Sequence, residues 1–117
     1  MDAEQIRSYC LEKKGVSESF PFNETTLVFK VGAKMFLLLS LDAFPLSFAV
    51  KTAPNWSEQL RESYSQIKGA YHMNKTHWNS VDPEGVPTEL LYKLIDHSYA
   101  LIFNSLSRKV REEITKG

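Results

Sequence analysis

LVFKVGAKMFLLL, residues 27–39, is the stretch of sequence that decides the fold. Two runs rich in β-branched, aromatic and aliphatic residues flank Gly32-Ala33, which is typical of two strands joined by a tight turn. We therefore expect a hairpin with strands at residues 25–31 and 34–41. The second run is apolar at almost every position, which indicates burial on both faces or a central place in the sheet.

A third strand and a helix are expected next along the chain. Residues 42–45 are predicted to turn and residues 46–51 to form a strand, so three antiparallel strands in a meander are the simplest arrangement. Pro54 suits the first turn of a helix that extends to about residue 64. Trp56 and Leu60 share one side of this predicted helix.

Helices are also expected at both ends of the chain. Asp2 can cap a first helix over about residues 3–13. Pro87 starts the longest helix, and the basic residues 107–116 are predicted to be helical too. Residues 71–82 are expected to be extended. Because strands and helices are segregated along the chain, the predicted class is α+β: one compact domain, residues 1–117, with an antiparallel sheet packed against helices.

The composition limits the class of protein. A chain of 117 residues suits one domain, and its single cysteine, Cys10, excludes an intrachain disulfide. Residues 1–12 lack the apolar core of a signal peptide, and no apolar run is long enough to span a bilayer. We therefore expect a cytoplasmic protein without a membrane partner. The 14 basic and 14 acidic residues give a net charge of zero, which argues against tight, nonspecific wrapping of nucleic acid but allows a local basic patch.

The most unusual segment is residues 71–79, Tyr71-His72-Met73-Asn74-Lys75-Thr76-His77-Trp78-Asn79. It is too polar for a core strand and too aromatic for an ordinary loop. Its lysine, histidine and asparagine side chains are donors suited to phosphates and base edges, and its aromatic rings could stack on bases. The alternative is a structural role, in which the aromatic rings join the core and the polar groups satisfy loop backbone.

The expected faces of this segment follow from strand geometry. In an extended segment, Thr76, Trp78 and Ser80 share one face. Lys75, His77 and Asn79 share the other. Because burial of an unpaired lysine is costly, the Lys75 face is expected to meet water, while Trp78 anchors the segment against the domain.

Metal binding and catalysis find little support in the sequence. His72 and His77 would lie on different sides of a strand or a helix, and no cysteine or carboxylate is near them in sequence to complete a zinc site. Cys10 falls on the apolar side of the first predicted helix, where it serves as a small hydrophobic residue rather than a nucleophile. No nucleotide-binding or nucleophile-elbow motif is present. We therefore expect a non-enzymatic protein with no cofactor, metal site or catalytic residue.

The chain resembles the MmcQ/YjbR family over nearly its whole length. The most specific match is Tyr71-His72-Met73-Asn74-Lys75-x-His77-Trp78-Asn79-x-Val81. The other matching segments are Glu18-Ser19-Phe20-Pro21-Phe22, Leu27-Val28-Phe29-Lys30-Val31, Lys34-Met35-Phe36, Lys51-x-x-Pro54 and Ser98-Tyr99. The sequence departs from the family at Lys68-Gly69-Ala70, where the family often has a proline, which predicts a less rigid loop.

The resemblance implies a fold and a function. The fold is a compact α-β(3)-α-β(2)-α domain, similar to frataxin-like and secretion-chaperone-like folds, in agreement with the element order predicted above. The function is DNA binding through a double-wing arrangement of β-hairpins, with no established enzymatic reaction. The residues expected to contact DNA are Lys30, Lys34, Lys51, Asn74, Lys75, His77 and Asn79. The signature residues expected to be structural are Tyr71, His72, Met73 and Trp78.

Two alternatives to DNA follow from the same likeness. A frataxin-like shape suggests iron binding by the first helix, but its acidic residues are offset by basic neighbours and form no run of adjacent carboxylates. A secretion-chaperone-like shape suggests a protein-interaction domain that uses the sheet face or residues 71–79. A contiguous positive patch would favour DNA, and an exposed apolar patch would favour a protein partner.

Overall fold

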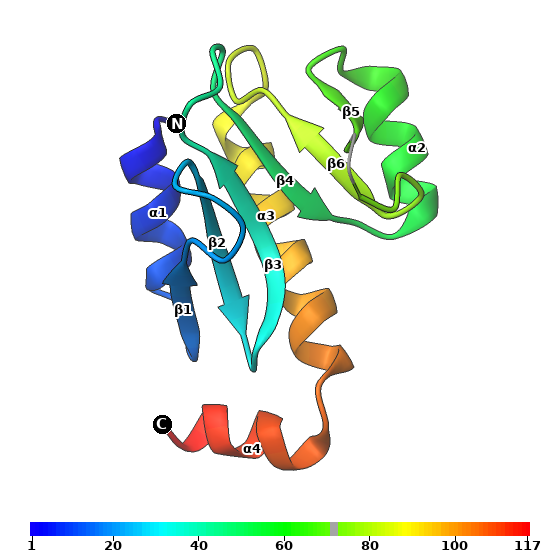
Figure 1. Cartoon of the computed structure of the whole chain (residues 1–117). Helices are drawn as coiled ribbons and strands as arrows, with labels where there is room; N and C mark the ends of the chain where they lie inside the picture. The colour runs from blue at the N-terminus through cyan, green and yellow to red at the C-terminus, as the bar shows by residue number, and fades with distance from the viewer. Residues whose placement is uncertain (71–72) are drawn as a thin grey trace.

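The fold is a six-stranded antiparallel sheet with four helices, seen in a computed structural model that describes residues 1–70 and 73–117 (Figure 1). The strand order is β1-β2-β3-β4-β6-β5. The predicted α+β class is confirmed. In chain order the elements are α1 (Ala3–Leu11), β1 (Val16–Ser19), β2 (Thr26–Val31), β3 (Lys34–Ser40), β4 (Ser47–Lys51), α2 (Pro54–Ser63), β5 (Ile67–Gly69), β6 (Trp78–Val81), α3 (Thr88–Ser105) and α4 (Arg108–Lys116).

A β-bulge explains why the apolar run of β3 does not alternate. The register between β2 and β3 shifts at Phe29/Lys30, so that Phe29 is opposite Leu37 and Lys30 is opposite Met35. Phe36 is the extra residue, and the bulge turns both Phe36 and Leu37 toward the helices, where both are completely buried. The predicted hairpin is confirmed, and β3 lies between two neighbouring strands, as its apolar run indicated.

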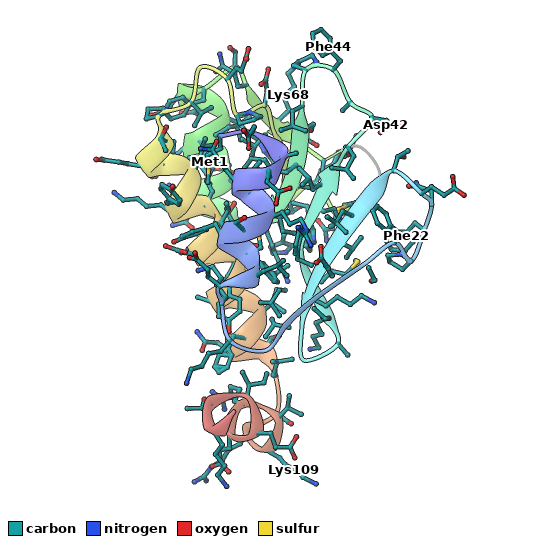
Figure 2. All side chains as sticks on the ribbon, turned by 90° about the vertical axis from the view of Figure 1, so that its left-hand side faces the viewer. Met1, Phe22, Asp42, Phe44, Lys68 and Lys109 are labelled. Atoms are coloured by element: carbon teal, nitrogen blue, oxygen red, sulfur yellow. The ribbon has the colours of Figure 1, made fainter. Side chains whose placement is uncertain are left out.

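One face of the sheet carries the hydrophobic core. Inward residues of β2, β3, β4 and β6 pack against Ile6 and Cys10 of α1, against Leu60 of α2, and against the apolar stripe of α3. Figure 2 shows α1 and α3 together on one side of the strands, and the loop with Phe22 on the other. In the described parts of the chain, no helix covers that second face.

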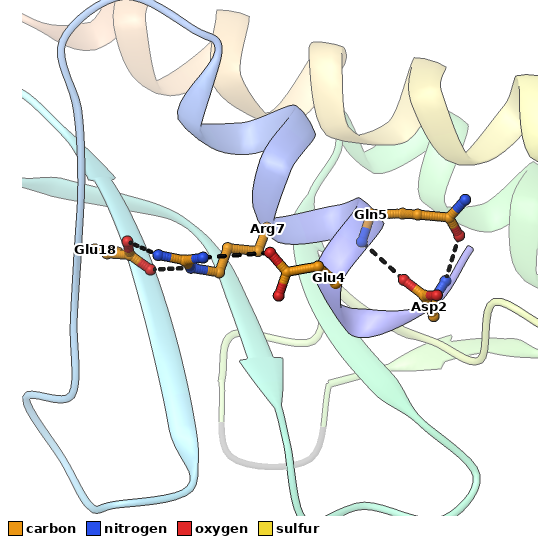
Figure 3. A network of polar contacts seen from close by, with 5 residues as sticks. All are labelled: Asp2, Glu4, Gln5, Arg7 and Glu18. Atoms are coloured by element: carbon orange, nitrogen blue, oxygen red, sulfur yellow. Dashed lines mark hydrogen bonds and ion pairs between the residues drawn. The ribbon is translucent and has the colours of Figure 1, made fainter.

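Polar contacts fix α1 at its start and along its side (Figure 3). Asp2 and Gln5 form a capping box, in which each side chain accepts a hydrogen bond from the other's backbone N–H, at 2.8 and 2.9 Å. Arg7 donates two hydrogen bonds to the carboxylate of Glu18 on β1, at 2.7 and 2.8 Å, and one to Glu4 at 3.3 Å. These carboxylates are therefore engaged with the fold, and they give the iron-binding alternative no support.

Close packing of α4 closes one end of the molecule. A Cβ placed on Gly32 would lie 2.6 Å from Leu106, which precedes α4, and 3.1 Å from Val110 of α4, and one on Gly15 would lie 2.8 Å from Ile114 of α4. Both glycines also have a positive φ, +55° and +73°, which other residues rarely adopt. The basic C-terminal segment is therefore an amphipathic helix docked on the turns of the sheet and not a loose basic tail. None of the helices described is long and apolar enough to cross a membrane.

Two details of the predicted element order are wrong. β1 was not expected, because only Val16 of its four residues is apolar and no alternation is visible over so short a run. Residues 71–82 are not one extended segment: residues 75–77 form a turn, and the strand begins only at Trp78. The three-stranded meander is thus the centre of a larger sheet, whose last two strands are β5 and β6.

His97 of α3 secures the start of α2. The backbone N–H of Ala53 donates to Nε2 of His97 at 3.2 Å, and the rings of Trp56 and His97 meet edge to face at 4.7 Å. Nε2 can accept this bond only in the neutral imidazole. Burial lowers the pKa of His97 from its ordinary value of 6.5, because desolvation disfavours the charged form.

This histidine is expected to make the stability depend on pH. Below pH 6.5 the unfolded chain takes up a proton at this residue, whereas the folded chain does so only at lower pH. The free energy of unfolding should therefore fall as the pH drops below about 6.5, and level off below the folded pKa. Urea unfolding at ~pH 7.5 and ~pH 5.5 measures the difference. His97→Gln, whose amide oxygen can still accept the Ala53 bond, should lose this part of the pH dependence; equal losses in both proteins would contradict the role of His97.

Candidate nucleic-acid interface

The face of the sheet opposite the helices, called here the open face, is defined by the strand register. One straight row of cross-strand neighbours crosses all six strands: Ser19, Val28, Leu38, Ala49, Ser80 and Lys68. Next to it lie a row of small hydroxyl residues, Thr26, Ser40 and Ser47, and the pairs Lys30–Met35 and Lys51–Trp78. The apolar residues between these positions, such as Phe29, Leu39 and Val50, belong to the core.

A groove of about 500 Å³ lies on the open face. Its floor is apolar, made by Met35, Leu38 and Ala49 of the sheet with Ala70 and Met73 beside it. Phe22, which is 62% exposed, forms one wall. The remaining lining residues are small and polar: Asn23, Thr26, Ser40, Ser47 and Ser80. The groove is therefore an apolar trough with hydroxyl groups along its sides.

Three lysines of the open face stand around this groove. Lys30 is directly opposite Met35, Lys51 lies two residues beyond Ala49 on the same side of β4, and Lys68 is opposite Ser80. Of the strand residues described, Glu18 alone is a carboxylate, and it points to the other face, toward Arg7. The strands thus present lysine and no carboxylate on the open face. Asp82, just after β6, borders the surface near Lys68 and accepts a hydrogen bond from the Glu84 N–H at 3.0 Å.

The predicted DNA contacts divide between several parts of the surface. Lys30 and Lys51 lie on the open face, as described above. Lys34 lies instead at the β2–β3 turn on the helix side, where its ammonium group is 3.5 Å from the hydroxyl of Ser105 on α3. Lys75 is exposed but lies over Gly69 beside Arg61 of α2, away from the groove. The seven predicted residues are therefore not brought together into one site.

Asn74 organises the turn that precedes β6. Its side-chain oxygen accepts a hydrogen bond from the Thr76 N–H at 3.0 Å, and its backbone oxygen accepts from the N–H groups of His77 and Trp78 at 3.2 and 2.9 Å. His77 is half-buried, and its backbone oxygen accepts from the Thr52 N–H at 2.8 Å. This turn, rather than a strand, places His77 next to Thr52, the residue that follows β4.

Asn79, which was predicted to contact DNA, is completely buried. Its amide donates to the Thr52 hydroxyl at 2.8 Å and accepts from Nε of Arg61 at 2.9 Å. Arg61 also donates to the backbone oxygens of Lys75 and Trp78. Ser57 of α2 completes this buried cluster through a hydrogen bond between its hydroxyl and that of Thr52. Asn79 is therefore a structural residue that joins β6, β4 and α2.

The faces predicted for residues 75–80 are corrected by this burial. The extended geometry holds only from Trp78 onward, so Lys75 and His77 do not share a strand face with Asn79. Asn79 points into the core, while Trp78 and Ser80 lie on the open face. Trp78 is half-buried next to Lys51 and is not part of the core, and Met73 lines the groove. Tyr71 and His72 lie outside the described residues.

Sequence reasoning missed two residues of the groove's surroundings. Lys68 lies in β5, a three-residue strand too short to show a pattern, so its face could not be predicted. Phe22 was named as part of a segment that resembles the family, but its position over the sheet depends on long-range folding. Each of β2, β3 and β4 contains one hydroxyl residue, Thr26, Ser40 and Ser47, and all three line the groove.

The described residues do not form the cysteine or metal sites that were considered from the sequence. Cys10 is buried, and desolvation raises the pKa of its thiol to about 12, so the reactive thiolate is disfavoured. In residues 1–70 and 73–117, no three or more His, Cys, Asp and Glu side chains gather as a metal site would require.

Comparison with known proteins assigns the chain to a family. The model of the YjbR family matches residues 11–101. The chain belongs to the YjbR family. Two relatives from Escherichia coli cover most of the chain: the uncharacterized protein YbdF of strain O157:H7 is 35% identical over 116 residues, 97% of this chain and 94% of its own length. The uncharacterized protein YjbR of strain K12 is 28% identical over 113 residues, 96% of each chain.

Solved structures support the fold of this YjbR-family chain. A Deinococcus radiodurans protein with a DUF419 domain superimposes with a TM-score of 0.90 at 37% identity, over 96% of this chain and 86% of its own. A Pseudomonas syringae protein superimposes with a TM-score of 0.75 at 24% identity, over 87% of this chain and 99% of its own, which is evidence on the fold alone. The family and its fold are thereby shown.

Loss of the Asn79 amide is expected to destabilise the chain. Asn79→Ala removes a buried donor and acceptor and leaves the Thr52 hydroxyl and the Arg61 guanidinium without this partner, which should cost about 1–3 kcal/mol of unfolding free energy. Urea denaturation measures it. Asn104→Ala, a change on the exposed side of α3, is the matched control and should stay within about 0.5 kcal/mol of the parent. An Asn79→Ala protein as stable as the control would show that the buried cluster does not hold β6 in place.

Proposed function

We propose that this protein binds DNA, without catalysing a reaction, through the open face of its sheet, and that it acts in the cytoplasm. One observation carries the proposal: Lys30, Lys51 and Lys68, from three different strands, stand around a groove on a sheet face without strand carboxylates. Phosphate groups are the ligands that such a lysine arrangement suits.

The zero net charge is compatible with this proposal because the charges are unevenly placed. Several acidic residues are engaged on the helix side: Glu4 and Glu18 with Arg7, and Asp96 with Lys13 and Tyr9. On α4, Arg108 pairs with Glu112. In this proposal, the lysines of the open face are the charges that meet the phosphates. Because they are few, modest affinity with a clear salt dependence is expected.

A protein partner is the second candidate, and a specific observation favours it. Four large apolar side chains near one end of the sheet are exposed: Phe20 by 48%, Phe22 by 62%, Leu41 by 43% and Phe44 by 102%. Exposed apolar surface of this kind is common where proteins meet. A partner bound there would be held by apolar contact, and its binding would change little with salt. The salt dependence of binding therefore separates the two candidates.

Neutralising the open face is expected to weaken DNA binding and its salt dependence. The triple variant Lys30→Gln, Lys51→Gln, Lys68→Gln should bind labelled DNA more weakly, whether single-stranded or duplex. For duplex DNA, the slope of log affinity against log salt should also fall by about 2–3 between ~50 and ~200 mM salt, since each phosphate contact contributes about 0.9. Fluorescence anisotropy measures both quantities.

The matched control changes three exposed lysines elsewhere, Lys93→Gln, Lys109→Gln and Lys116→Gln on α3 and α4. It alters the net charge equally and should leave affinity and slope near those of the parent. Equal loss in both triple variants would place the contact outside the open face. No binding by the parent to either form of DNA at low salt would overturn the proposed function.

A further inference from the structure

The apolar floor of the groove is a feature that phosphate binding alone leaves unused. Met35, Leu38, Ala49, Ala70 and Met73 form it, and Phe22 stands at its side. A ligand that contacts the protein only through phosphates would be held above this floor by the lysines. An apolar trough with three lysines at neighbouring strand positions instead matches a ligand that is anionic along a backbone and carries flat, weakly polar groups.

An aromatic side chain lies on each side of this arrangement. Phe22 is 62% exposed at one wall, although a phenylalanine gains free energy from burial. Trp78, half-buried on the open face, is directly opposite Lys51 on β4. Aromatic rings next to lysines are the combination that holds bases by stacking and their phosphates by charge.

Hydroxyl groups complete the surroundings of the groove. Ser40, Ser47 and Ser80 line it, and each hydroxyl can donate and accept a hydrogen bond. Base edges offer both donors and acceptors, so these side chains suit any base without selecting one strongly. Sequence preference is therefore expected to be weak.

We infer that the open face binds single-stranded DNA, with one or more unpaired bases lying in the groove between Phe22 and Ala49 and the flanking phosphates on Lys30, Lys51 and Lys68. In a duplex the bases are stacked and paired inside the helix, so only phosphates, sugars and groove edges can meet a sheet. The apolar floor would then remain empty. The inference rests on the proposed function and adds the form of DNA that the site takes.

The test compares three fluorescent probes with the full chain. They are a thymidine strand of about 12 nucleotides, an abasic strand with the same number of phosphates, and a duplex of the same length. The thymidine strand should bind at least about tenfold more tightly than the abasic strand, and more tightly than the duplex, because stacked bases add free energy that phosphates do not.

Point variants test whether the difference in affinity between the thymidine and abasic strands arises in the groove. Phe22→Ala should lower the affinity for the thymidine strand toward that for the abasic strand. The affinity for the abasic strand itself should stay unchanged. Lys68→Gln should lower the affinity for both strands by the same factor. Phe44→Ala is the matched control, since Phe44 is fully exposed and does not line the groove, and it should leave all three affinities unchanged. Far-ultraviolet circular dichroism confirms the fold of each variant.

The outcomes separate this inference from the proposed function. Equal binding of the thymidine and abasic strands, or tighter binding of the duplex, overturns the inference while DNA binding stands. Displacement of the thymidine strand by a polyglutamate peptide as readily as by unlabelled strand overturns the inference too, since only charge would then be recognised. Failure of all three probes to bind at low salt overturns the inference together with the proposed function.

Discussion

The β-bulge between β2 and β3 is the constraint on which the arrangement of the molecule depends. Because it places the two consecutive residues Phe36 and Leu37 on the same side of β3, that side receives more apolar volume than a regular strand could supply. Phe36 then contacts Tyr99 of α3 edge to face at 5.4 Å. The helices collect on this face, and the opposite face keeps the small and basic residues of the same strands together with Val28, Met35 and Leu38.

A second constraint is polar and ties the elements of the core together. Ser98 on α3 donates to the backbone oxygen of Phe36 at 2.5 Å and accepts from the Lys51 N–H at 2.9 Å, so one hydroxyl joins α3 to β3 and β4. Asn79 does the same for β6, β4 and α2 through Thr52 and Arg61. Several of the residues that carry the family likeness are thus explained by folding: Asn79, Ser98 and the turn residue Asn74 hold backbone in place. The lysines of the open face, in contrast, have positions that folding alone does not require.

Sequence alone predicted the elements with strong patterns and failed where side-chain direction depends on pairing. The hairpin at residues 25–41, the helix from Pro54 and the long helix all follow from local signals, and each is present. β1 and β5 have four and three residues, too few to show alternation. For the candidate site, Lys30 and Lys51 were named correctly as residues of the sheet, but Asn79 was assigned to the solvent side because the turn at residues 75–77 could not be foreseen. Lys68 and the wall made by Phe22 depend on contacts between segments that are distant in sequence.

The central claim is that the face of the sheet without helices is the ligand-binding surface. The most direct measurement is a titration of the isotope-labelled chain with a thymidine oligonucleotide, followed by backbone amide chemical shifts. The account predicts that the largest changes map to the open face, at Lys30, Leu38, Ala49, Lys68 and Ser80, while amides on the outer sides of α1 and α3 change little. Changes concentrated on those helices or on α4, with the open face unaffected, would contradict it.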